Sequence, residues 1–83
     1  MKTPISELPF MGGTQKLYRF PNEYGASVVN HSFSYGQELA VLEWIGNDRK
    51  LCYTTPVTDG VIGHLSDEER EKILQQIEDL PAR

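Results

Sequence analysis

One capped, amphipathic helix is predicted by the stretch Leu65-Ser66-Asp67-Glu68-Glu69-Arg70-Glu71-Lys72-Ile73-Leu74-Gln75-Gln76-Ile77-Glu78-Asp79-Leu80-Pro81. Ser66 followed three residues later by Glu69 fits a capping box, in which each side chain accepts a hydrogen bond from a backbone amide of the first turn. The acids of that turn lie at the positive end of the helix dipole, where negative charge is favoured. Pro81 ends the helix, because the residue before a proline disfavours helical backbone.

This predicted helix has one apolar and one acidic face. The apolar stripe recurs at helical spacing and consists of Ile73, Leu74, Ile77 and Leu80. The opposite side carries Glu68, Glu71, Gln75, Glu78 and Asp79. One face therefore has to be buried, and the other repels anions.

Four strand-like segments precede the helix, rich in β-branched and aromatic residues and separated by turn residues. They are Lys16–Phe20, Ala26–Phe33, Glu38–Ile45 and Lys50–Thr55. Connections this short favour antiparallel neighbours. The predicted fold is α+β, a three- to four-stranded antiparallel β-meander packed against one C-terminal α-helix. Residues 1–15, with two prolines and Gly12-Gly13, are predicted to form an irregular arm before a single α+β domain over 16–83.

Side-chain alternation predicts which residues share a face of the sheet. A two-residue turn at Asn47-Asp48 places Trp44 opposite Leu51 and Leu42 opposite Tyr53. A turn at Tyr35-Gly36 places Val29 opposite Leu42 and His31 opposite Ala40, which brings Phe33 to the same face. We expect the helix to cover this face, together with Tyr18 and Phe20. The predicted shared core is Val29, Leu42, Trp44, Tyr53, Ile73 and Ile77.

The other face of the sheet is then left without a helix. It includes four aliphatic residues among polar ones, Val28, Leu39, Val41 and Ile45. Such a surface is covered either by the N-terminal arm or by another chain. We predict that a protein partner, or a second copy of the chain, contacts this face or an edge strand of the sheet.

Few residues suggest catalysis or metal binding. Cys52 and His31 fall on opposite sides of the predicted sheet, so a cysteine nucleophile with a histidine base is disfavoured, and Cys52 is expected to be a small core residue. His64 is expected to be a solvated loop histidine. The histidines, cysteine and acids lack the spacing of a metal site, and no glycine-rich segment has the context of a phosphate loop. No catalytic residue, cofactor or metal is predicted.

Composition limits the possible partners and location. The 83 residues are 39% hydrophobic and carry a net charge of −4. No cluster of lysine or arginine exceeds the pair Arg49-Lys50, so direct binding of nucleic acid is disfavoured. No apolar run approaches the length of a membrane span or of a signal peptide, and the single cysteine fits a reducing compartment. A cytoplasmic protein that binds no membrane is predicted.

The charge is concentrated near the C-terminus. Between Asp59 and Asp79, seven acidic and two basic residues give a net charge of −5. The acidic helix face, with Glu68, Glu71, Glu78 and Asp79, is either a solvated surface, a surface that steers a basic partner, or the contact surface of a DNA mimic.

Three segments and the terminal helix carry a resemblance. They are Leu17-Tyr18-Arg19-Phe20-Pro21-Asn22-Glu23-Tyr24-Gly25-Ala26-Ser27-Val28-Val29, Glu38-Leu39-Ala40-Val41-Leu42 and Tyr53-Thr54-Thr55-Pro56-Val57-Thr58-Asp59-Gly60-Val61-Ile62-Gly63. Over residues 17 to 80 the chain resembles small uncharacterised proteins encoded by tailed phages and prophages. The resemblance implies a genomic setting and the length of a fold unit, without an activity or catalytic residues. Small phage proteins outside the structural module often bind a host or phage protein, and this is what the resemblance leads us to expect.

Two classes of function follow from the sequence. The first is a non-catalytic interaction module that acts as an inhibitor or adaptor on a host or phage protein. The second is a small ligand-binding domain or enzyme, for which a pocket with convergent polar groups is the distinguishing feature.

Overall fold

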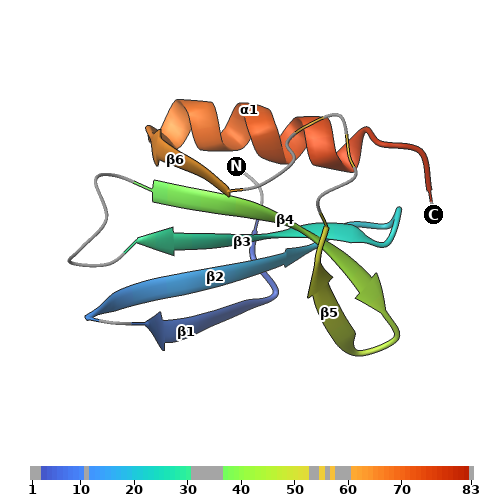
Figure 1. Cartoon of the computed structure of the whole chain (residues 1–83), viewed down its shortest axis with the longest axis horizontal. Coiled ribbons are helices and arrows are strands. Elements are labelled where there is room, and N and C mark those ends of the chain that lie inside the picture. Colours follow the sequence, from blue (N-terminus) through green and yellow to red (C-terminus); the bar gives the residue numbers. More distant parts are fainter. Residues whose placement is uncertain are drawn as a thin grey trace.

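The computed structural model describes residues 3–10, 12–30, 37–52, 55, 57 and 61–82. In these residues the chain forms one antiparallel sheet with a helix lying along it (Figure 1). The elements are β1 (Ser6–Phe10), β2 (Gly13–Arg19), β3 (Tyr24–Asn30), β4 (Gln37–Ile45), β5 (Asp48–Leu51), β6 (Val61–Leu65) and α1 (Asp67–Glu78). The α+β class and the C-terminal helix are confirmed. The described residues contain six strands, however, where three or four were predicted.

The two additional strands are β1 and β6. β1 pairs with β2 from Ser6 opposite Leu17 to Phe10 opposite Gly13, and Gly12 in the intervening turn has a φ of 81°. The prediction of an irregular arm over residues 1–15 is therefore wrong for β1. The strand forms because β2 supplies partners for its backbone groups, a contact that the local composition, with Pro9 inside the strand, does not indicate.

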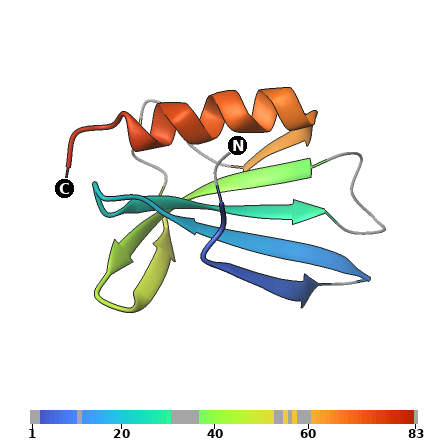
Figure 2. The ribbon, with the colours of Figure 1, turned by 180° about the vertical axis from the view of Figure 1, so that it is seen from behind.

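The strand order is β1-β2-β3-β4-β5, and β6 also pairs with β4. The nine-residue β4 holds both neighbours on one side, since Gln37 to Ala40 pair with β6 and Leu42 to Ile45 pair with β5. Seen from behind, β5 crosses the direction of β2 and β3 steeply (Figure 2). The two edges of the described sheet are therefore β1 on one side and β5 with β6 on the other.

The pairing of β4 with β5 differs from the prediction by one position in the turn. The turn is Gly46-Asn47, so Leu42 lies opposite Leu51 and Trp44 opposite Arg49. Similarly, Leu42 lies opposite Gly25 in β3, and the predicted partner Val29 lies opposite Glu38. Each shift moves the partners by an even number of residues, so the residues of β3, β4 and β5 that were predicted to share a face still share it. Tyr53, His31 and Phe33 lie outside the described residues.

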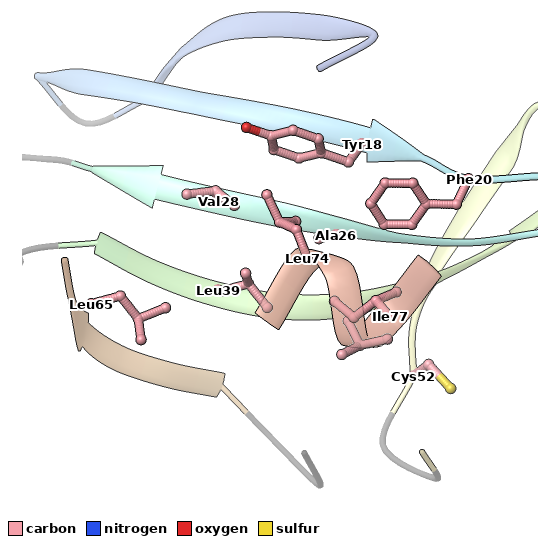
Figure 3. Packing of buried hydrophobic residues seen from close by; sticks show 10 residues of the cluster. Tyr18, Phe20, Ala26, Val28, Leu39, Cys52, Leu65, Leu74 and Ile77 are labelled. Atoms are coloured by element: carbon pink, nitrogen blue, oxygen red, sulfur yellow. The ribbon is translucent and has the colours of Figure 1, made fainter. Parts of the chain in front are cut away.

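The helix packs on the face opposite to the predicted one (Figure 3). The main core cluster joins Leu74 and Ile77 of α1 to one face of the sheet. Its members from the sheet and its connections are Tyr18, Phe20, Ala26, Val28, Leu39, Val41, Cys52 and Leu65. The helix stripe, the position of Tyr18 and Phe20 beneath the helix and the burial of Cys52 agree with the prediction. Tyr18 and Phe20 do not, however, share their face with Leu42 and Trp44 as predicted. The assignment of Leu42 and Trp44 to the helix side was wrong, because both faces of β4 are apolar and alternation alone does not tell which one a helix covers.

A second, smaller cluster lies on the other face and contains Leu17, Leu42 and Trp44. The indole of Trp44 crosses Gly25 in β3, and its Nε1 donates to the carbonyl oxygen of Tyr18 at 3.0 Å. The Arg19 guanidinium lies 5.2 Å from the centre of the indole ring, in a cation–π contact. Trp44 therefore covers the sheet on the side that the helix does not reach.

Both ends of α1 are satisfied by side chains. At the N-terminus, the amide of Glu69 donates to Ser66 Oγ and the amide of Ser66 donates to Glu69 Oε1, which confirms the capping box. At the C-terminus, Nδ2 of Asn22, in the turn between β2 and β3, donates to the carbonyl oxygens of Ile77, Glu78 and Leu80. These bonds fix the helix on the sheet and thereby set the position of its first turn.

Candidate functional site

The predicted contact surface on the sheet does not exist as a free surface. Val28 is 2% exposed, and Leu39 and Val41 are fully buried beneath α1. A partner cannot reach these three side chains in the folded protein, so their assignment as contact residues is wrong. Ile45, the fourth residue of the set, is 48% exposed near the end of β4.

Exposed apolar side chains are found instead at the edges of the sheet and at the ends of its strands. They are Ile5, Leu8, Ile45, Leu51 and Val61. Leu51 and Val61 lie opposite Leu42 and Ala40, two successive positions on one face of β4, so they are neighbours about 7 Å apart along the same edge. All four residues of β5 are exposed.

The acidic residues of the helix are not equivalent. The Glu68 side chain lies in the solvent, while Glu71 Oε2 accepts a hydrogen bond from Nε of Arg70 at 2.9 Å. Glu78 is half-buried, and Asp79 is exposed and accepts from Nε2 of Gln75. Glu71 therefore holds a buried cation in place, whereas Glu68 and Asp79 form part of an acidic outer surface.

A pocket of about 220 Å³ opens beside the first turn of α1, on the face of the sheet that the helix covers. It is lined by Thr14, Lys16, Val28, Asn30, Gln37, Asp67 and Arg70. Thr14 and Lys16 of β2 lie directly opposite Asn30 and Val28 of β3. Figure 1 shows β2 extending beyond the start of the helix. Thr14 and Asn30 are exposed and Lys16 is half-buried, whereas Val28 is buried.

Arg70 is the best-anchored polar residue of this pocket. Its side chain is 6% exposed, and its Nη1 donates to Gln37 Oε1 at 2.8 Å and to Asp67 Oδ1 at 3.2 Å. Gln37 Nε2 in turn donates to the same Asp67 oxygen at 2.8 Å. The guanidinium is thus held by neighbours on the strand and on the helix, in an orientation that the fold determines.

The charges of Arg70 and Glu71 also affect the pKa of Tyr18, which lies in the main core cluster. Burial is the main cause that raises the pKa of its phenol above the usual 10.0, the positive charge of Arg70 opposes this shift, and Glu71 and Glu7 add to it. Tyr18 therefore stays a neutral member of the core at neutral pH.

The structure describes no arrangement typical of metal binding or nucleophilic catalysis. Within the described residues, no group of three His, Cys, Asp or Glu side chains is placed to hold a metal ion. Cys52 is buried in the main core cluster, and His64 is exposed in β6 with a φ of 59°, where a loop was predicted. No helix in the described part of the chain is long and apolar enough to span a membrane.

The sequence contains signals for the pocket that the prediction missed. Arg70 precedes Leu74 by four residues and Ile77 by seven, so it lies on the apolar stripe of the helix, where a charged residue needs partners. Gln37 precedes the buried Leu39 by two residues on the same strand and hence shares its face. Lys16 is related to Tyr18 in the same way. A polar or charged residue at a core-facing position was therefore the sequence signal that could have indicated the pocket.

Comparison with protein-family models, with curated proteins and with solved structures finds no match to this chain.

Proposed function

We propose that this chain is a small non-catalytic protein-interaction module, encoded by a phage or prophage, that acts as an inhibitor or adaptor on a host or phage protein in the cytoplasm of the host cell. The observation that carries the proposal is the neighbouring pair of exposed aliphatic side chains at one edge of the sheet, Leu51 at 49% and Val61 at 58% exposure. Exposed apolar residues that adjoin each other are typical of contact surfaces.

The backbone of β5 provides the second half of this contact surface. β5 pairs with β4, and within the described residues no further strand pairs with its outer side. An extended segment of a partner can add to such an edge through backbone hydrogen bonds, while Leu51 and Val61 offer apolar contact. We place the contact there, in place of the buried residues of the helix side.

The acidic outer surface of the helix has a separate role in this proposal. Glu68 and Asp79 steer a basic partner toward the protein, because exposed charges act on the rate of encounter over about 8–10 Å. They lie away from the sheet edge and make no lasting contact in the complex.

The proposal is tested by affinity capture from the lysate of a natural host, followed by binding kinetics with the captured protein. The Leu51→Glu, Val61→Glu double variant is expected to lose capture, since it places two charges in the apolar contact. Leu8→Glu is the matched control, because Leu8 is a partly exposed leucine on the opposite edge strand. Equal capture by the double variant and wild type would rule out this edge.

Charge removal on the helix gives the second arm of the test. Exchanging Glu68 and Asp79 for Gln is expected to slow association and reduce its salt dependence, with dissociation nearly unchanged. Complete loss of binding in this variant, with full binding by the sheet-edge variant, would favour a DNA-mimic inhibitor instead.

A further inference from the structure

The pocket beside the first turn of α1 is independent of the proposed protein contact. It lies on the helix side of the sheet, whereas Leu51 and Val61 lie on the other face. Its volume of about 220 Å³ is below the range of roughly 300–1,000 Å³ that is usual for drug-sized ligands. The pocket therefore suits a small molecule or one end of a larger ligand.

Arg70 presents an unused donor group to this pocket. Its hydrogen bonds to Gln37, Asp67 and Glu71 involve Nε and Nη1, and among the described residues no hydrogen bond from Nη2 is found. The residue as a whole is only 5% exposed and lines the pocket. Among the described residues no side-chain nitrogen or oxygen is both fully buried and without a hydrogen-bond partner, so Nη2 reaches accessible space. The pocket that Arg70 lines is where its two N–H groups can donate to a ligand in place of water.

Three further groups with hydrogen-bonding capacity converge on the same space. Lys16 is half-buried at the rim and forms no ion pair among the described residues, so its ammonium is available. Thr14 adds a hydroxyl and Asn30 an amide from the neighbouring strand ends. Together these groups offer a positive, donor-rich lining above the apolar floor made by Val28.

The charged lining residues Lys16, Arg70 and Asp67 give the pocket a net charge of +1, which favours a ligand with one negative charge. Lys16 and Arg70 are cationic, while the Asp67 carboxylate lies at the rim with its side chain 75% exposed, and Glu71 pairs with the far side of Arg70. A dianion such as phosphate would be repelled by these acids and by the neighbouring Glu68 and Glu69. A single carboxylate fits the positive balance of the lining.

We propose that this pocket binds one carboxylate group, which accepts hydrogen bonds from Arg70 Nη2 and from the ammonium of Lys16, with Thr14 and Asn30 binding the atoms next to it. The carboxylate belongs either to a small free organic acid or to the C-terminus of a peptide. The two sources share the chemistry at the two cations and differ in what extends from the pocket.

The proposal is tested by titrating the full chain and following backbone amide signals by NMR, at constant ionic strength. The probes are butyrate for a free acid and N-acetyl-dialanine for a peptide C-terminus. We expect saturable shifts at Lys16, Asn30 and Arg70, with a dissociation constant on the order of 1–10 mM. Tighter binding of N-acetyl-dialanine than of butyrate identifies a peptide C-terminus, and the reverse identifies a free acid.

Lys16→Gln provides the decisive variant, since removing an unpaired rim cation leaves the fold intact. It is expected to weaken binding about tenfold, as is typical for loss of a charge-assisted hydrogen bond. Lys50→Gln is the matched control, because it removes the same charge from an exposed position of β5. Its affinity is expected to equal that of the wild type.

Three outcomes would overturn the proposal. The first is the absence of saturation up to about 100 mM acid, where binding of this affinity is nearly complete. The second is equal weakening by Lys16→Gln and Lys50→Gln, which would show a general charge effect. The third is binding of inorganic phosphate, or of the neutral amide of N-acetyl-dialanine, as tight as that of the carboxylates.

Discussion

Gly25 is the residue on which the second face of the sheet depends. A methyl group at this position would meet the carbonyl oxygen of Tyr18 and the indole nitrogen of Trp44. These two atoms are joined by the hydrogen bond that holds the indole flat on the sheet. The glycine therefore permits a close approach of backbone and side chain, which is one of the uses of this residue type.

Gly25→Ala is expected to lower the free energy of unfolding by about 2–4 kcal/mol, from overpacking and loss of the indole hydrogen bond. Gly63→Ala is the control within the sheet, because its new methyl group would lie 3.8 Å from Cγ of Glu38, an ordinary contact. Urea denaturation monitored by tryptophan fluorescence measures both. Equal stability of the two variants would contradict the placement of Trp44.

Residue-level reasoning from the sequence was strongest where a residue acts on its immediate neighbours. Ser66 and Glu69 were assigned correctly because a capping box spans three residues. Asn22 was identified only as a turn residue, although its amide also binds the end of a helix 55 residues later in the chain. Local patterns carry no information about such long-range partners, and only the buried position of the side chain shows them.

At the scale of the elements, α1 is held at both ends by different chemistry. Its last turn contains no basic residue that would balance the dipole, and the amide of Asn22 takes this role. Oδ1 of the same side chain accepts from the amide of Tyr24, so the turn between β2 and β3 and the helix C-terminus are joined through one residue.

Asn22→Asp separates the two functions of this side chain. The substitution keeps the acceptor for Tyr24 but replaces the donor with a negative charge beside three carbonyl oxygens. We expect a loss of about 1–3 kcal/mol in the free energy of unfolding, with amide exchange fastest in the last turn of α1. Unchanged stability and exchange would show that the helix C-terminus does not depend on Asn22.

The N-terminal capping box gives a pH dependence. Hydrogen bonds from the Ser66 amide and hydroxyl, and the charge of Lys72, hold the pKa of Glu69 below its usual 4.5. A carboxyl with a lowered folded-state pKa stabilises the protein above its unfolded-state pKa, and this contribution disappears as the pH falls through the folded value.

The stability difference between wild type and Glu69→Gln is therefore expected to be present at neutral pH and to disappear in acid below pH 4.5. Ser66→Ala removes the reciprocal bond and is expected to cost about 0.5–2 kcal/mol at neutral pH. Thermal unfolding across this pH range measures both effects. A difference for Glu69→Gln that grows toward acid pH would have the wrong sign for this account.

At the scale of the whole molecule, the sequence predicts the helix and most of the strands but not which face of the sheet the helix covers. The helix, four strands and the residues sharing each face of β3, β4 and β5 follow from periodicity. The side on which the helix lies does not, since β4 presents Leu39 and Val41 on one face and Leu42 and Trp44 on the other. Only the packing of Trp44 across Gly25, and of Tyr18 beneath the helix, decides between them. The pocket was missed as well, because its position depends on which face of the sheet the helix covers. It lies on that face, beside the first turn of α1.

Charge insertion on the two faces tests this arrangement. Val41 is fully buried beneath α1, so Val41→Glu places an unpaired charge in the core at a cost of several kcal/mol. A chain of this length has a total stability of only about 4–12 kcal/mol, so most or all of it is expected to be lost. Leu51→Glu, at a half-exposed edge position, is expected to change stability by less than about 1 kcal/mol.

Circular dichroism melts and the dispersion of amide signals distinguish these two variants before any binding measurement. A folded Val41→Glu protein with the melting temperature of the wild type would mean that the helix leaves this face open. The face around Val28, Leu39 and Val41 would then again be a candidate contact surface. If Val41→Glu unfolds while Leu51→Glu stays folded, lost binding in the first variant reports loss of the fold. Lost binding in the second then reports the contact itself, which makes the sheet edge the surface where the partner has to be sought.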